Sequence, residues 1–233
     1  MEKKEFPDKK EFPNKFEGEL KPQEPVVSGK LSKFFDKVLG VTKLLLGLCL
    51  LPVVYSSLSA FLNEISLINK NHQNYFFSGV ATFLAVHLFI WEPAIIYNKG
   101  HRVLEIIFNF FRPLVKFAPY VLPIYTIVVF VIYGVLSFFI QAAWLAELLL
   151  FLSGFTIILH LTFSVRTIRS KKGDFLKANY IFGFAFIFIV NLFLLSVCFN
   201  FVLAKFSLVN FANNSFALSK VVISSVFKQL FIN

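Results

Sequence analysis

Residues 100–105, Gly-His-Arg-Val-Leu-Glu, hold the side chains of this chain that are best suited to chemistry. A helix with the pattern His-Glu-x-x-His binds zinc between two imidazoles one turn apart, and the Glu beside the first His activates water. Here His101 takes the first ligand position, Arg102 stands where the general base belongs, and Glu105 replaces the second His. Arg102 accepts no proton at any working pH, and its fixed charge repels a nearby zinc ion. The usual activation of water is therefore excluded, although the Glu105 carboxylate can still coordinate metal.

The same stretch also fits an amphipathic helix at a membrane surface. His101, Glu105, Asn109 and Arg112 fall on one helical face, and apolar residues cover the rest. Glu105 stands one turn from both His101 and Arg102, so it is expected to pair with them. This second interpretation needs no metal.

Two other ionisable residues are expected at membrane depth, where such groups are costly and mark candidate sites. Glu92 and His160 belong to different hydrophobic stretches. At about 1.5 Å per helical residue, Glu92 lies roughly 10 Å inside Lys99 and His160 roughly 9 Å inside Arg166, so the two can meet at one depth. A lone buried His is more often a packing residue than a metal ligand.

His160 is also part of a polar helix face, which should point into a bundle rather than at lipid. The members of this face recur at steps of three or four residues: Ser153, Thr156, His160, Ser164 and Thr167.

The composition places these residues in a membrane. Of 233 residues, 57% are hydrophobic and 15% are charged, and no soluble domain of this length needs so much apolar surface. The net charge of +10 does not indicate nucleic-acid binding, because most basic residues flank hydrophobic stretches. We therefore predict an all-α integral membrane helical bundle, with about five transmembrane helices plus interfacial amphipathic helices. Five stretches approach or exceed the roughly 20 apolar residues that cross a bilayer: 41–62, 75–98, 119–141, 145–166 and 179–204.

The loops between these stretches predict the orientation. Basic residues gather before the first span, after the second and after the fourth, whereas the opposite loops hold few charges. We therefore expect a multi-pass protein of the bacterial inner (plasma) membrane, with its amino terminus in the cytoplasm and its carboxyl terminus outside. The expected parts are a disordered cytoplasmic tail (1–38), a five-span membrane domain (39–205) and an extracytoplasmic amphipathic tail (206–233).

Two blocks of the sequence resemble a known family. Trp91-Glu92-Pro93 leads to Gly100-His101, and Ala118-Pro119-Tyr120-Val121-Leu122-Pro123-Ile124-Tyr125 follows. In this order they resemble compact bacterial relatives of the site-2 protease family of intramembrane zinc metallopeptidases. In those relatives a Gly-His-Glu-x-x-His helix precedes an Ala-Pro-Tyr-x-x-Pro-x-Tyr block.

The resemblance implies zinc ligands at His101 and Glu105, with His160 as a candidate for a further ligand and Arg102 in the general-base position. The Asp-Gly motif that supplies the third ligand in many members is absent, since the only acid after the fourth span is Asp174.

We therefore expect a protein that resembles site-2 proteases but has no catalytic residues and no cofactor, and that acts by binding another membrane protein or a lipid. One alternative is an active protease in which His101, Glu105 and His160 hold zinc and Glu92 is the base. Another is a small proton-coupled transporter, or a transporter subunit, that uses Glu92 and His160. The lipid bilayer is the expected surrounding, nucleic acid is not an expected partner, and the oligomeric state stays open.

Overall fold

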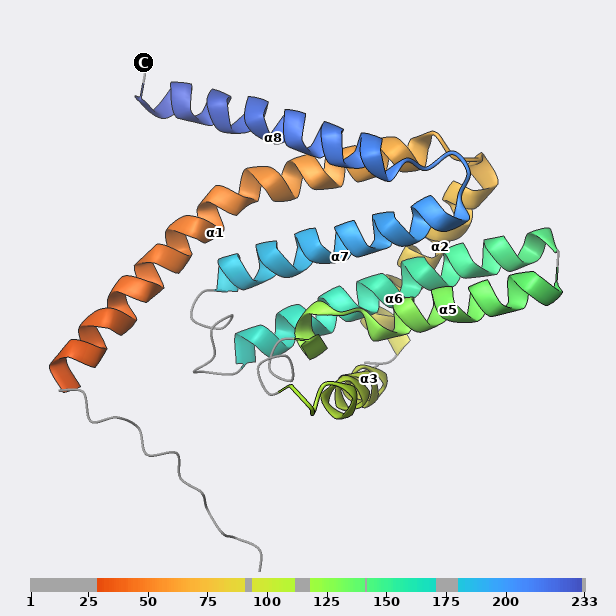
Figure 1. Ribbon diagram of the computed structural model, residues 1–233, viewed down its shortest axis with the longest axis horizontal. Helices are drawn as coiled ribbons and strands as arrows, with labels where there is room; N and C mark the ends of the chain where they lie inside the picture. The colour runs from red at the N-terminus through yellow and green to blue at the C-terminus, as the bar shows by residue number, and fades with distance from the viewer. Residues whose placement is uncertain (1–28, 91–93, 112–117, 141, 171–179, 232–233) are drawn as a thin grey trace, which may run out of the picture. The chain divides into compact units, whose positions relative to one another are not determined.

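The computed structural model describes residues 29–90, 94–111, 118–140, 142–170 and 180–231 (Figure 1). Every regular element in these ranges is a helix, which confirms the predicted all-α class. The elements are α1 (Gly29–Ser66), α2 (Lys70–Ala85), the π-helix η1 (Val86–Ile90), α3 (Ala94–Ile107), α5 (Ile124–Phe139), α6 (Ala143–Ser170), α7 (Tyr180–Val202) and α8 (Leu208–Phe231). A further helical turn covers residues 118–121.

The chain divides into two units between Lys37 and Val38. Residues 1–28 of the predicted tail lie outside the described residues, and α1 already begins at Gly29, inside that tail. Leu31, Phe34 and Phe35 follow the helical spacing of apolar residues, so they extend the pattern of the first span toward the amino terminus. The bundle and the candidate site belong to the second unit.

Three segments of the described chain are long and apolar enough to cross a membrane: Val38–Ser66, Ala143–Ile168 and Tyr180–Val202. α2 with η1 passes the same test together with α3, as a bent pair that makes a fourth span. α5 is apolar but has only 16 residues. The structure thus gives three to four spanning segments where the sequence predicts five, because the span predicted at 119–141 is a helical turn followed by a short helix.

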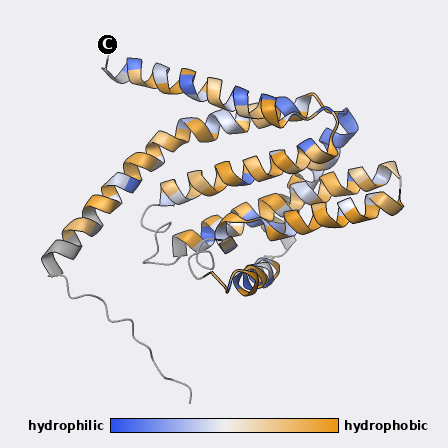
Figure 2. Cartoon of the chain, viewed as in Figure 1, coloured by the Kyte–Doolittle hydropathy of each residue, from blue (hydrophilic) through white to orange (hydrophobic). Residues whose placement is uncertain are grey.

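The outer surface of the bundle is suited to lipid. Large apolar side chains stand largely uncovered, among them Phe89 and Phe138 at 85% exposure and Phe201 at 83%. An aqueous surface rarely carries so many of them together. In Figure 2, α5, α6 and α7 are mostly hydrophobic, whereas hydrophilic positions recur along α8.

The second predicted span, 75–98, is not one straight helix. α2 passes at Val86 into η1, and α3, which begins at Ala94, is bent by 116° from the preceding helix. Pro93 falls in the interval 91–93, which lies outside the described residues. A proline removes a backbone donor and clashes with the preceding helical turn, so a proline in the sequence of a span favours a break that hydropathy alone does not reveal.

The most extensive helix contact joins α2 and α6. A β-carbon built on Gly79 of α2 would lie 1.9 Å from the carbonyl oxygen of Phe151. One built on Gly154 of α6 would lie 2.2 Å from the carbonyl oxygen of Phe76. Neither position has room for a side chain, so the two backbones touch. Small residues permit such contact in a bilayer, where close packing rather than the hydrophobic effect joins helices.

An aromatic cluster joins α1 to the end of α7 and the start of α8. The Phe61 ring stacks on Phe199 with centroids 6.0 Å apart and meets Phe211 edge-on at 6.4 Å. Nearby, the Glu64 side chain is only 1% exposed and accepts a hydrogen bond of 3.2 Å from the backbone nitrogen of Ser207. Its carboxylate thus caps the start of α8, where negative charge complements the helix dipole.

α5 and α6 form the antiparallel hairpin that the short link between their predicted spans indicates. α5 ends at Phe139 and α6 begins at Ala143. Within the hairpin, the hydroxyl groups of Thr126 and Thr156 share a hydrogen bond of 2.9 Å. The polar face of α6 is therefore turned into the bundle at this level, as the sequence predicts.

Gly79→Ala and Gly154→Ala are each expected to lower the free energy of unfolding by about 1–3 kcal/mol, because the added methyl group meets backbone atoms. Gly134→Ala is the matched control, since nothing lies within 4 Å of a β-carbon at that position and alanine favours a helix over glycine. Thermal unfolding in detergent, followed by circular dichroism, should give lower midpoints for the first two variants only. Unchanged midpoints in both would contradict the backbone contact.

Candidate functional site

Gly100 and Tyr125 hold α3 against the start of α5. A β-carbon on Gly100 would lie 2.7 Å from the Tyr125 ring, so the two elements touch there. The Tyr125 hydroxyl donates a hydrogen bond to the carbonyl oxygen of Ile96. These contacts accompany the burial of Tyr97, Gly100 and Leu104 on one side of α3.

The exposed side of α3 mixes apolar and charged residues. Ile95, Val103 and Ile106 are 60%, 46% and 70% exposed, and Lys99 and Arg102 are exposed beside them. The helix therefore presents apolar groups to the surroundings, as a helix at a lipid interface does. Of the predicted polar face, Asn109 is exposed and Arg112 lies outside the described residues.

His101 and Glu105 form the pair that their spacing predicts. Nδ1 of His101 lies 3.3 Å from a carboxylate oxygen of Glu105. The His101 side chain is 14% exposed and that of Glu105 is 47% exposed, so the pair runs from the interior to the surface. The neighbouring Arg102 is exposed.

The His101 ring packs between two tyrosines. Its centroid lies 6.0 Å from that of Tyr97 and 5.0 Å from that of Tyr120, which it meets edge-on. Tyr97 belongs to α3 and Tyr120 to the helical turn before α5. His101 thus helps to fill the junction between these two elements.

Backbone carbonyls at this turn are paired by side chains of α6 and α7. The backbone nitrogen of Ile124 bonds the carbonyl of Leu122, so the Tyr120 carbonyl lacks its regular helical donor. Nε2 of His160 lies 3.1 Å from that oxygen. Nδ2 of Asn191 donates to the next carbonyl, that of Val121, at 3.0 Å. Inside a bilayer no water can replace these donors, so the pairing permits the broken helix at this depth.

Ser164 extends the pairing to α3. Its Oγ lies 3.2 Å from Nε2 of His160 and 3.1 Å from the Tyr97 hydroxyl. Because a carbonyl only accepts, Nε2 of His160 must carry the hydrogen that it shares with Tyr120. Ser164 and His160 are 0% and 4% exposed. One buried chain of hydrogen bonds therefore links α3, α6 and the turn before α5.

His87 lies at the edge of this junction, in η1. Its ring stacks on Phe83 and meets Phe163 edge-on, with centroids 5.6 Å apart in both pairs. Phe163 in turn stacks on Tyr97 at 5.5 Å. His87 is thus a packing residue between α2 and α6.

Two of the predicted zinc ligands come together in the structure. The rings of His101 and His160 lie on Tyr97, with centroids 6.0 and 6.1 Å from it. Glu105 reaches the surface beyond His101, and Glu92, the alternative base, lies outside the described residues. Within the described ranges, no three His, Cys, Asp or Glu side chains are arranged to hold a metal ion. The ligand set of His101, Glu105 and His160 stays a prediction.

Sequence reasoning missed Tyr97 and the role of the Tyr120 carbonyl. The signal was the pair Pro119 and Pro123 at a spacing of four. A proline has no backbone N–H, so two of them close together predict carbonyls that need donors from other helices.

Comparison with protein-family models, with curated proteins and with solved structures finds no match for this chain.

His160→Ala is expected to lower the free energy of unfolding by about 1–3 kcal/mol, because it leaves the buried Tyr120 carbonyl without a donor. His160→Gln keeps an N–H donor, so its free energy of unfolding should fall by less. Ser137→Ala is a control, since the Ser137 hydroxyl donates to the Gly134 carbonyl of its own helix and joins no second helix among the described residues. Unfolding of the four proteins in detergent tests this order. Equal losses in His160→Ala and Ser137→Ala would contradict the pairing role.

Proposed function

We propose that this chain is a non-catalytic relative of the site-2 proteases that acts by binding another membrane protein or a lipid. The observation that carries the proposal is the position of Arg102, an exposed side chain one residue after His101 in α3. Its fixed positive charge beside the first ligand position raises the free energy of a bound cation. Nε2 of His160 donates to the Tyr120 carbonyl, so this His already has a role in joining the helices.

The residues of the motif support the same proposal. Nδ1 of His101 is paired with Glu105, which occupies one ring nitrogen without a metal. Arg102 has no proton-accepting atom, so it does not replace the Glu that activates water in the family. A hydrolytic reaction would need another base, and the one described carboxylate that contacts His101, that of Glu105, is already paired with it.

The proposed relationship rests on the order of two elements. α3 carries the Gly-His stretch and follows the interval that contains Pro93, and the turn with Ala118-Pro119-Tyr120 comes next. Gly100 and Tyr125, which belong to the resembling blocks, are the residues through which α3 meets α5. The resembling residues thus lie where two elements meet. This agrees with a retained scaffold whose chemistry has been lost.

Purified full-length protein incubated with zinc and then desalted is expected to retain less than one zinc per chain and to leave a membrane-spanning test substrate uncut. His101→Ala and Glu105→Ala should change neither result, and a chelator should leave the unfolding midpoint where it was. Metal analysis, electrophoresis of the substrate and circular dichroism give the three readouts. Zinc at one per chain, together with cleavage that disappears in Glu92→Gln, would refute the proposal in favour of an active protease.

A further inference from the structure

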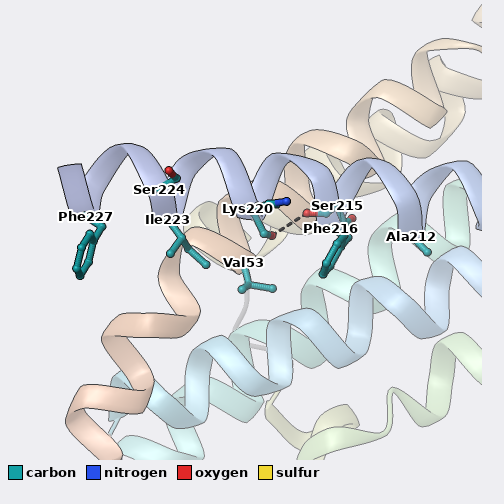
Figure 3. Close-up of a pocket in the computed structure, with 9 residues that line it drawn as sticks. Val53, Ala212, Ser215, Phe216, Lys220, Ile223, Ser224 and Phe227 are labelled. Atoms are coloured by element: carbon teal, nitrogen blue, oxygen red, sulfur yellow. Dashed lines mark hydrogen bonds between the residues drawn. The ribbon is translucent and has the colours of Figure 1, made fainter. Parts of the chain in front are cut away.

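An open groove of about 700 Å³ runs between α1 and α8. Val53 lines it from α1, and residues from Ala212 to Phe227 line it from α8. In Figure 3, the side chains of Phe216, Ile223 and Phe227 extend from α8 toward the side on which Val53 lies. The volume is within the range of about 300–1,000 Å³ that is usual for ligand sites.

The wall of this groove is almost entirely carbon. Phe216 and Phe227 are 75% and 56% exposed, so a large part of each side chain is accessible. Ser219 also lines the groove. Its hydroxyl donates a hydrogen bond of 2.7 Å to the Ser215 carbonyl of the same helix. The polar atom of Ser219 is thereby satisfied internally. What the groove offers is a long apolar surface that suits an acyl chain.

Positive charge accompanies this apolar surface. Lys220 lines the groove, and Lys228 follows two turns later, in the last turn of α8. Residues 205–233 contain three lysines and no Asp or Glu. Nothing acidic in the sequence of this segment therefore offsets the two charges. A helix that presents lysines beside an apolar surface binds anionic membrane lipid through both the charge and the apolar contact.

We propose that the α1–α8 groove is a binding site for an anionic phospholipid, whose acyl chain lies against Val53, Phe216 and Phe227 and whose phosphate pairs with Lys220 and Lys228. A zwitterionic phospholipid fits the apolar wall equally well, but its choline brings a positive charge toward the lysines. Charge complementarity therefore selects the anionic headgroup, by about fivefold for each lysine. This inference rests on the proposed binding function and names its ligand.

The test uses delipidated full-length protein in detergent, mixed with phosphatidylglycerol or phosphatidylcholine of identical acyl chains, with native mass spectrometry of the bound lipid. The natural sequence should retain phosphatidylglycerol at least fivefold more strongly. Lys220→Gln with Lys228→Gln should abolish that preference. Lys205→Gln removes the same charge from an exposed position that does not line the groove, so it should leave at least a fivefold preference. Ala212→Trp adds bulk at an exposed lining position and should weaken retention of both lipids.

Equal retention of the two lipids by the natural sequence would overturn the proposal, as would a preference that survives in the double lysine variant. A dimer that excludes lipid would also overturn it and would assign the groove to a second copy of the chain. The result is separable from the test of catalysis. If the protein cleaves a substrate and also prefers phosphatidylglycerol, the proposed function is refuted and the lipid site stands. If the protein neither cleaves a substrate nor prefers phosphatidylglycerol, the lipid site alone is refuted.

Discussion

The contact between the backbones of α2 and α6 decides where the other helices can lie. Gly79 and Gly154 have no space for a side chain, so one side of α6 is committed to α2. The polar side of α6 is then left for its remaining neighbours. Thr156 bonds α5 through Thr126, and Ser164 reaches Tyr97 of α3. The junction around Tyr97 and His160 is assembled on a helix whose rotation is set by two glycines.

The second constraint is the absence of water in the bilayer core. A helix that stops and restarts there must find donors for its open carbonyls, each of which otherwise costs several kcal/mol. His160 and Asn191 supply these donors to Tyr120 and Val121. This explains why ionisable or polar residues occur so deep in α6 and α7 without any chemistry being required of them. Position at membrane depth is thus a weaker sign of catalysis in this chain than it is in general.

Sequence reasoning predicted the helical class, the polar face of α6 and the His101–Glu105 pair, because each depends on spacing within one segment. It failed where a break depends on proline and on distant partners. Hydropathy averages over Pro93 and Pro123, so the spans predicted at 75–98 and 119–141 look continuous although the structure interrupts both. Sequence reasoning missed Tyr97 because its hydroxyl shares a hydrogen bond with Ser164, which is 67 residues away in the sequence.

The hydrogen bond at His160 would not by itself keep zinc out. Losing it exposes one carbonyl, at a cost of about 1–3 kcal/mol, whereas a complete structural zinc site contributes about 10–16 kcal/mol. That larger figure belongs to sites with four ligands that can shed their protons. Here the described residues bring together two imidazoles, and the carboxylate that is nearest to them already pairs with one. Arg102 adds a fixed positive charge next to His101, which raises the free energy of a bound cation further. The number of ligands and the sign of the charge, rather than the strength of one hydrogen bond, therefore argue for a junction that holds helices together.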